Sequence, residues 1–257
     1  MSGTTAPSGV ATRHAPRVSA LPRDVAERLA ATEYDRVLAS LRQLTAEDWG
    51  RPTACPSWDV RAMAGHMLGM AEFAATLREN LRQGREARRA GGVWIDALTA
   101  LQVAEHSHLN PAELTARFEV MAPRAARGRR RVPGFARRRR MAVSQPVGDT
   151  TEPWTYGYVI ETIATRDCWM HRLDIAAATG RSPVLTPGHD GVLVADVARE
   201  WATRHRQPCT LRLSGPAGGV FEFGTGGPAL ELDATEFCRI IAGRAPGEGL
   251  LAVPVPF

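Results

Sequence analysis

Two residues with metal-binding side chains, Asp167 and His171, are four positions apart in the run RDCWMHRLD. On a helix this spacing projects both side chains from one face. A carboxylate and an imidazole arranged in this way are able to chelate one divalent cation. The same spacing also arises by chance, and it would then give an ordinary ion pair on the helix surface. The pair alone leaves both interpretations open.

A third candidate ligand, His66, lies among small and apolar residues in the run AGHMLG. These surroundings predict a side chain in the interior of a helical bundle, as a hydrogen-bonded core residue or as a ligand. Two histidines and one carboxylate with an open coordination position are the ligand set of many catalytic zinc sites. The same set suits iron and nickel. We therefore predict a divalent metal, with zinc foremost, that activates a thiol or a water.

The cysteines Cys55, Cys168, Cys209 and Cys238 are scattered and form no CxxC pair, which predicts free thiols in a reducing compartment. Cys168 follows Asp167 directly, so its side chain is turned about 100° away around the helix. Neither Cys55 nor Cys168 has a neighbouring base in the sequence, and neither is predicted to be a nucleophile.

Other side chains near the candidate ligands have open roles. Asp174 follows His171 by three residues, and it either holds the second ring nitrogen of His171 or faces solvent. His106 and His108 are alternative ligands, but their polar context EHSHLN predicts exposure. The remaining aromatic candidates are Trp58 and Trp169, which we expect in the bundle core or in a pocket wall.

The candidate ligands require helices to position them, and hydrophobic periodicity predicts four helical stretches before residue 180. The expected ranges are about 22–44, a long run that starts near Ser57, about 94–121 with a break near Asn110, and about 153–180. Ser57 is the expected N-cap of the second stretch, Asp59 favours its positive end, and Gly180 is the expected terminator of the fourth.

After residue 180 the sequence changes from helical periodicity to short alternating runs. A linker precedes a helix at about 192–205, followed by the strand-like runs CTLRLSG, GVFEFG and PALELDA and a helix at about 236–242. The last residues, LLAVPVPF, predict an extended edge segment. The fold class is α+β. We expect a flexible tail over 1–20, a metal-binding four-helix bundle over 21–182 with an Arg-rich loop at 123–145, and a small α/β domain over 183–257.

The formal net charge of +5 is distributed unevenly, because the excess is concentrated between Pro123 and Arg140. All basic residues are Arg, a pattern typical of a GC-rich genome, and no aromatic residues interleave at base-stacking spacing. We expect a solvated loop there and no nucleic acid partner.

The sequence has no apolar run long enough to span a membrane and no apolar leader core, so a cytoplasmic protein without membrane contacts is expected. Nothing demands a subunit interface, so we expect a monomer.

Three segments resemble the mycothiol-dependent maleylpyruvate isomerase family, within the wider group of DinB-like metalloenzyme bundles. The segments are TACPSWDVRAMAGHMLG, TEPWTYGYVIETIATRDCWMHRLDIAAATGR and ELDATEFCRIIAGRAPGEGLLAVPVPF. The last is similar to the end of the sterol-carrier-like domain that accompanies the bundle. The resemblance runs from about residue 22 to the end of the chain.

The resemblance implies that His66, Asp167 and His171 are the metal ligands, although the characterised isomerase has Glu where this chain has Asp167. It also implies a C-terminal arginine in the active site, for which Arg239 and Arg244 are the candidates. A guanidinium there would bind a substrate carboxylate. The implied cosubstrate is mycothiol, which would attack a small, acidic electrophile in an isomerisation or thiol transfer. The alternatives are a hydrolase that uses metal-bound water and a non-enzymatic ligand-binding protein.

Overall fold

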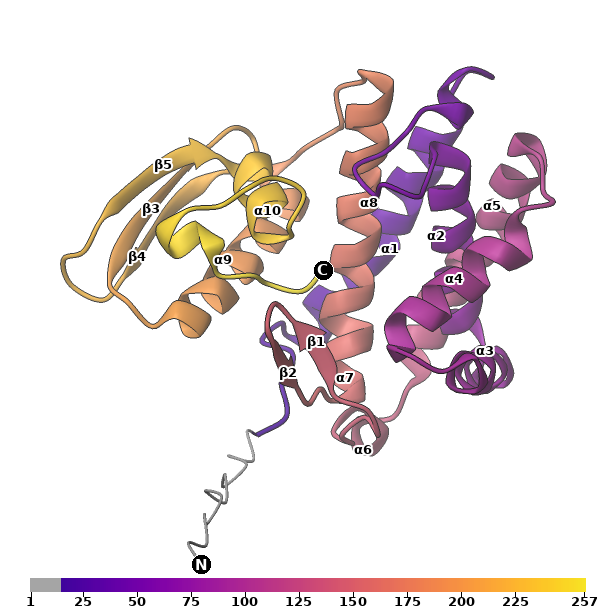
Figure 1. Cartoon of the computed structure of the whole chain (residues 1–257), viewed down its shortest axis with the longest axis horizontal. Coiled ribbons are helices and arrows are strands. Elements are labelled where there is room, and N and C mark those ends of the chain that lie inside the picture. The colour runs from indigo at the N-terminus through magenta and orange to yellow at the C-terminus, as the bar shows by residue number, and fades with distance from the viewer. Residues whose placement is uncertain (1–14) are drawn as a thin grey trace, which may run out of the picture.

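The structure, a computed structural model, describes residues 15–257 of the chain. A helical bundle and a smaller domain of helices and strands lie on either side of helix α8 (Ala164–Thr179), as Figure 1 shows. The two lobes confirm the α+β class that the sequence predicts. The boundary after residue 182 stays a prediction, since the core of the small domain continues onto α8.

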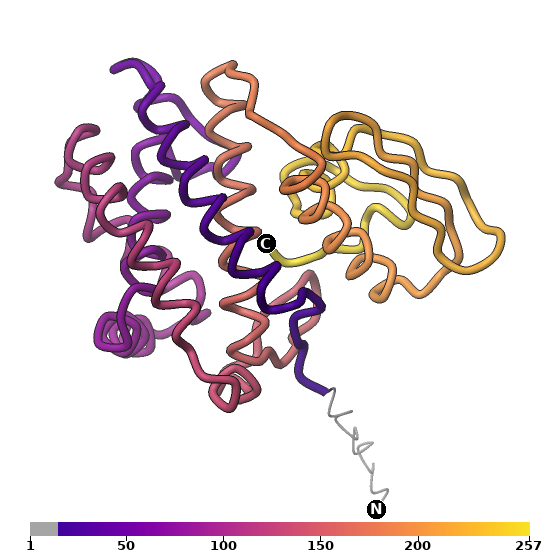
Figure 2. The backbone as a smooth tube through the Cα atoms, turned by 180° about the vertical axis from the view of Figure 1, so that it is seen from behind, coloured from indigo at the N-terminus to yellow at the C-terminus, as the bar shows by residue number. Residues whose placement is uncertain are grey.

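Four helices pack together as the bundle: α1 (Arg23–Leu41), α2 (Val60–Ala75), α5 (Pro111–Arg131) and α8. Two further helices, α3 (Leu77–Ala90) and α4 (Trp94–His106), cover α2 from outside. Figure 2 shows α1 and α8 side by side from behind. Among residues 15–257, no helix is long and apolar enough to cross a membrane.

The helix ends follow local side chains, and two of them differ from the sequence prediction. Asp59, rather than Ser57, caps α2 by accepting a hydrogen bond from the backbone N–H of Ala62. The long second stretch is two helices, because Thr76 is extended and caps α3. The predicted break near Asn110 is confirmed, since Asn110 caps α5 and forms a reciprocal capping box with Glu113.

The prediction of a loop at 123–145 is wrong over its first part. Helix α5 continues through Pro123 to Arg131, and a short helix, α6 (Gly134–Arg137), follows. Arg129 is buried and donates to the carbonyl oxygen of Ile160 at 2.8 Å, while Arg137 forms an ion pair with Glu161. The contacts of these two buried arginines order the segment, which the charge run alone does not indicate.

The predicted tail is also ordered where the structure describes it. The backbone N–H of Arg17 donates to the carbonyl oxygen of Pro153, and Thr155 donates back to Arg17. Residues 15–20 therefore lie along the start of the fourth helical stretch. The prediction for residues 1–14 lies outside the described residues.

The fourth helical stretch is one run in three parts. A short helix, α7 (Tyr156–Tyr158), leads through a π-helical turn, Val159–Ile163, into α8. Wider turns of this kind are rare and often occur near functional sites, because they rotate the side chains that follow. Gly180 terminates α8 in the left-handed conformation with φ of 66°, as predicted.

The small domain packs α9 (Val192–His205) and α10 (Ala234–Ile241) with a three-stranded sheet. The strands have the order β4-β3-β5 and span Gly219–Phe223, Cys209–Ser214 and Ala229–Asp233. Strand β3 runs antiparallel to β4 and parallel to β5. A separate hairpin, β1 (Gln145–Val147) and β2 (Thr150–Glu152), precedes α7.

The predicted edge segment at the end of the chain does not join the sheet. Gly249–Ala252 form a 3-10 turn, and the N–H of Val255 donates to the carbonyl oxygen of Ile241 in α10. The two prolines of this segment lack the N–H groups that a sheet edge would use. The segment instead returns toward α8, as Figure 1 shows.

Buried ion pairs join α8 to its neighbours. Arg172 donates to Glu33 of α1 at 2.6 Å and to Asp190, in the segment after α8, at 2.8 Å. Trp169 also donates its indole N–H to Asp190. Three charged groups and one indole in fixed geometry favour one placement of the small domain on the bundle.

Candidate metal centre

The side chain of His66 on α2 converges with those of Asp167 and His171 on α8. His66 and Asp167 are 101 positions apart in the sequence. The Nε2 atom of His66 lies 3.4 Å from Oδ1 of Asp167, and the Nε2 atom of His171 lies 3.3 Å from the same oxygen. Both imidazoles are buried, and the Asp167 side chain is 17% exposed. The structure thus brings together all three predicted ligands.

These separations fit a shared cation better than direct hydrogen bonds. An ordinary N–H···O hydrogen bond is about 2.9–3.0 Å long. Two ligands of a tetrahedral zinc ion with bonds of about 2.0–2.1 Å lie about 3.3–3.4 Å apart. The second oxygen of Asp167, Oδ2, is buried and has no hydrogen-bond partner. A buried orphan oxygen is costly unless an ion or water satisfies it.

Each histidine is fixed through its other ring nitrogen. Nδ1 of His66 donates to Oε1 of Gln102 at 2.9 Å, and Nε2 of Gln102 donates to Oε1 of Gln83 at 2.9 Å. Gln102 and Gln83 are buried on α4 and α3. This amide chain occupies Nδ1, so Nε2 is the ring nitrogen of His66 that faces Asp167 and could bind a metal.

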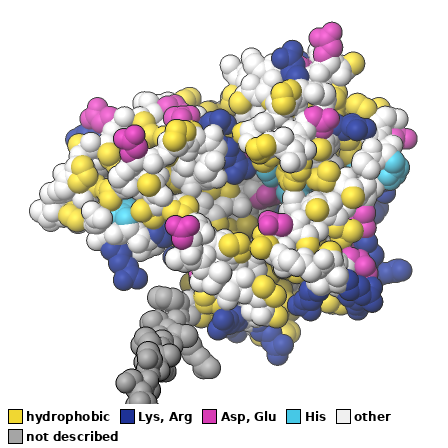
Figure 3. Space-filling view, in the orientation of Figure 1, with side chains coloured by type: hydrophobic (Ala, Val, Ile, Leu, Met, Phe, Trp, Pro, Cys, Tyr) yellow, Lys and Arg dark blue, Asp and Glu magenta, His cyan; other side chains and the backbone are white. Residues whose placement is uncertain are grey.

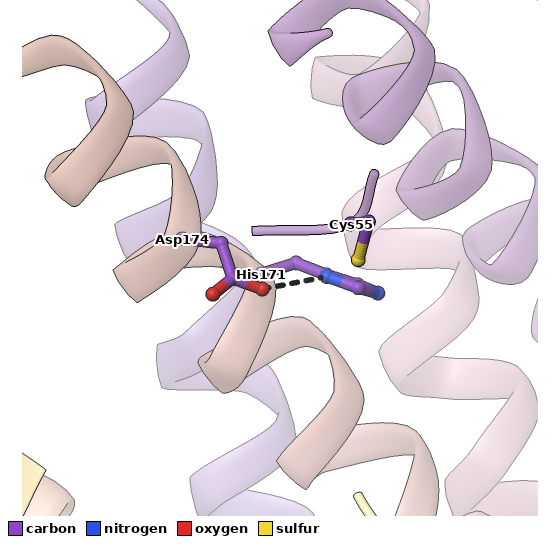
Figure 4. A group of neighbouring side chains, drawn as sticks. All are labelled: Cys55, His171 and Asp174. Atoms are coloured by element: carbon purple, nitrogen blue, oxygen red, sulfur yellow. Dashed lines mark hydrogen bonds and ion pairs between the residues drawn. The ribbon is translucent and has the colours of Figure 1, made fainter. Parts of the chain in front are cut away.

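The second histidine has an acidic partner. Nδ1 of His171 lies 3.3 Å from Oδ2 of Asp174, which Figure 4 shows as a dashed line. Asp174 is buried, and it also contacts Arg239 at 3.5 Å and Arg244 at 3.3 Å. Of the two alternatives for Asp174, the structure therefore supports the partner of the imidazole. Both candidate arginines reach the centre through this one carboxylate.

The carboxylates and imidazoles of the centre shift one another's pKa values. Burial opposes ionisation of Asp167, but the two imidazoles outweigh it and hold the pKa of this carboxyl far below its usual range. Burial would also lower the pKa of His171, but Asp167 and Asp174 raise it to about 9. The carboxylates thus attract positive charge into this space, as a metal site must.

Cys55, which the sequence does not mark as functional, lies beside the centre. Its Sγ atom and ligand atoms of His171 and Asp174 all lie within 4.8 Å of one another, as Figure 4 illustrates. Burial first, and the nearby Asp174 carboxylate, raise the pKa of the Cys55 thiol. Cys55 therefore lines the site, and its role there stays the prediction made from the sequence, which is that it is not a nucleophile.

The loop that carries Cys55 also supplies the wall of the site. Thr53 bonds the carbonyl oxygen of Trp58 through its backbone N–H and its hydroxyl. The Trp58 ring lies 5.1 Å from the ring of His66 and 5.8 Å from that of His171. This places Trp58 in the pocket wall. The run TACPSW ahead of α2 is the signal that could have marked both residues.

The remaining candidates lie elsewhere. His106 is buried, contrary to the predicted exposure, because it bonds the carbonyl oxygen of Gln102 at 2.7 Å and Glu72 at 3.1 Å. His108 is exposed. Cys168 packs in the bundle core and is not part of the cluster, and Trp169 is buried against the small domain.

Figure 3 shows a hollow between the two lobes, with basic side chains on the side of the small domain and histidine and acidic side chains on the side of the bundle. The exposed fractions of the side chains agree with access from this hollow. Arg239 is 24% exposed and Arg244 is 18% exposed, whereas the Asp174 that they contact is fully buried. Both arginine side chains are therefore partly open to solvent, although Nη1 of Arg239 is itself buried.

The fold and site together define a class of protein: a helical bundle with a two-histidine, one-carboxylate cluster between two of its helices, joined to a small α/β domain. The chain belongs to the mycothiol maleylpyruvate isomerase family, since the family's N-terminal domain matches residues 10–176. This match confirms the resemblance seen in the sequence.

Two solved structures share the fold of this chain. The crystal structure of the mycothiol-dependent maleylpyruvate isomerase superposes with a TM-score of 0.57 at 16% identity, covering 88% of this chain and 90% of that one. A variant of that enzyme gives a TM-score of 0.53. At this identity the likeness shows the fold. Uncharacterized proteins of Mycobacterium tuberculosis strains CDC 1551 and H37Rv are 27% identical over 230 residues, covering 82% of each chain.

Proposed function

We propose that the protein is a metal-dependent, mycothiol-using isomerase or thiol transferase that acts on a small acidic electrophile. The observation that carries the proposal is the convergence of two buried Nε2 atoms on one oxygen of Asp167, with each Nδ1 already bonded. Family membership supports mycothiol as the cosubstrate.

His66, Asp167 and His171 would hold the metal, with zinc proposed foremost and nickel or iron as alternatives. A divalent cation in this position would lower the pKa of a thiol enough to supply a thiolate near neutral pH. The residues of the chain set up this chemistry in advance. Gln102 and Asp174 hold the two rings in the orientation that would present Nε2 to the cation.

Arg239 and Arg244 would bind the carboxylate of the electrophile. Their contacts to Asp174, at 3.3–3.5 Å, are longer than ordinary charge-assisted hydrogen bonds, and Nη1 of Arg239 has no hydrogen-bond partner. These donors can turn to a substrate carboxylate without breaking a strong bond. Trp58 offers an apolar surface beside the reacting atoms.

The reaction begins when the thiolate sulfur adds to an unsaturated carbon of the electrophile and forms a C–S bond. The electron pair of the former double bond moves toward the substrate's electron-withdrawing group, near the arginines that stabilise its charge. If rotation about the new single bond precedes expulsion of the thiol, the product is the other geometric isomer. If the carbanion instead takes up the proton that the thiol lost, the C–S bond persists and the outcome is thiol transfer.

Metal analysis of the purified protein, followed by His66→Ala, tests the ligand assignment. We expect one divalent metal per chain in the parent protein and at least a tenfold loss of metal affinity in the variant. His108→Ala is the matched control, because that histidine is exposed and is not one of the clustered residues. An unchanged metal content in His66→Ala would contradict the assignment.

The cobalt-substituted protein tests the role of the thiol. Addition of mycothiol should change the visible spectrum, because sulfur would replace an exchangeable ligand. A loaded protein whose spectrum does not respond would remove the thiol from the mechanism. Activity without any thiol would favour the hydrolase, and a protein without metal would favour a ligand-binding role. A cytoplasmic monomer remains our prediction.

A further inference from the structure

The arginines of the protein are concentrated at one end of the bundle. Residues 120–148 contain nine Arg and no Asp or Glu, so this stretch carries +9 and the rest of the chain carries −4. Helix α3 adds five Arg against two Glu. Of the nine arginines in this stretch, only Arg129 and Arg137 are buried. Most of the other arginines in the two segments therefore have no role in the core that would explain their number.

We define the basic face as the exposed arginines of α3, the end of α5 and the segment around α6. They are Arg78, Arg85, Arg88, Arg89, Arg124, Arg127, Arg130, Arg131, Arg138, Arg139 and Arg140. Among residues 15–257, only Arg89 of this set has a carboxylate within 4.0 Å, namely Glu86. The face is thus unneutralised positive charge.

The three segments lie at the same end of the molecule. A Cβ on Gly128 of α5 would meet the carbonyl oxygen of Ala74 at 2.1 Å, which shows that α5 passes directly against the end of α2, where α3 begins. Figures 1 and 2 place α3 and α6 at the same end of the bundle, and Figure 3 shows basic side chains along that edge. The charges form one surface.

Large apolar side chains are exposed on the same surface. Leu77 is 73% exposed, Leu81 is 55% exposed and Phe135 is 67% exposed. Apart from valines and Tyr156, these are all of the exposed large apolar residues within 15–257. Leu and Phe gain nothing from phosphate groups in water, but they gain free energy on entering the acyl boundary of a bilayer.

We propose that the basic face binds the surface of a membrane that contains anionic lipids. The arginines would contact lipid phosphates, and Leu77, Leu81 and Phe135 would enter the interface between them. The charges alone would also attract a nucleic acid, but the exposed leucines and phenylalanine favour the bilayer. The sequence predicts no membrane contacts because it has no spanning run and no apolar leader. Neither feature is needed for binding to the surface of a bilayer.

Sedimentation of the full chain with vesicles tests the proposal. We expect binding to vesicles of phosphatidylcholine with an equal amount of phosphatidylglycerol, weakened by added salt, and little binding to phosphatidylcholine alone. The triple variant Arg138→Gln, Arg139→Gln, Arg140→Gln should bind about a hundredfold more weakly. The matched control is Arg42→Gln, Arg51→Gln, Arg61→Gln, which removes the same charge from the opposite end of the bundle.

A second variant separates a bilayer from other polyanions. Phe135→Ala should weaken binding to the anionic vesicles several-fold and leave retention on heparin unchanged, because heparin offers charge without an apolar phase. Equal losses in the two triple variants would overturn the proposal. Salt-sensitive binding to DNA without vesicle binding would also overturn it and would assign the face to nucleic acid.

Discussion

The two histidines of the candidate centre are held by different kinds of partner. His66 is fixed by a neutral amide, Gln102, that belongs to the bundle alone. His171 is fixed by a carboxylate, Asp174, that is shared with Arg239 and Arg244 of the small domain. One ligand is thus positioned within a single lobe, and the other is coupled to the surface that would bind the electrophile.

The difference suggests a division of roles within one centre. A neutral amide fixes a ring without adding charge, so the His66 side sets geometry. A buried carboxylate fixes a ring, raises its basicity and holds two cations at once. A change on the His171 side should therefore alter both metal binding and substrate binding, whereas a change on the His66 side should alter metal binding alone.

Asp174→Ala should have the largest effect, because it removes the partner of His171 and the counter-charge of both arginines. We expect metal affinity to fall by about tenfold to a hundredfold, and KM for the acidic substrate to change as well. Competition with a chelator and steady-state kinetics measure the two effects. Asp174→Asn is the control, since it keeps an acceptor for His171. Unchanged KM in Asp174→Ala would break the proposed coupling.

Gln102→Leu should lower metal affinity by about tenfold, because the Nδ1–H of His66 loses its acceptor in a buried site. KM should remain near its parent value in the metal-loaded variant. Gln102→Glu, which keeps an oxygen facing His66, should restore metal affinity. If Gln102→Leu altered KM as strongly as Asp174→Ala does, the partners of His66 and of His171 would not differ in their effect on substrate binding.

Gly69→Ala should perturb the neutral side through packing. A Cβ at this position would lie 2.5 Å from Cγ of Gln102, so the amide would have to move. We expect a loss of about 1–3 kcal/mol in the free energy of unfolding, measured by urea denaturation, with a small loss of metal affinity. Gly50→Ala is the control, since its Cβ would meet nothing within 4 Å. A neutral Gly69→Ala would mean that the amide chain adapts freely.

Acid should weaken the ion pair between Arg166 of α8 and Glu200 of α9, which are 2.8 Å apart. We expect this to be the smallest of the four predicted effects. Burial opposes ionisation of Glu200, but Arg166 and Arg204 outweigh it and lower its pKa. The stabilisation is complete above the unfolded pKa of about 4.3 and is lost as the pH falls through the lower folded value. Urea midpoints between neutral and acidic pH measure this slope. Glu200→Gln should flatten it, and an unchanged slope would contradict the assignment.

The sequence predicts the fold class, most helix positions and the three side chains that converge, His66, Asp167 and His171, because these depend on periodicity, spacing and three family-like segments. It does not predict that Gln102 and Gln83 support His66, since a buried glutamine has no sequence signature. The exposure predicted for His106 is wrong for a related reason, because Gln102 and Glu72 satisfy it inside the bundle. Pro123 within α5 shows likewise that packing overrides a local helix breaker.

The buried carboxylate of Asp190 has a practical consequence for anyone who wishes to study the bundle by itself. It comes from the segment just after α8, and it accepts from Arg172, Arg36 and Trp169. A fragment that stops at Thr179 would lose one of the two carboxylates that pair with Arg172, and it would expose apolar side chains of α8, such as Trp169 and Met170, that pack against the small domain. The helical bundle should consequently fold poorly when expressed without its smaller neighbour.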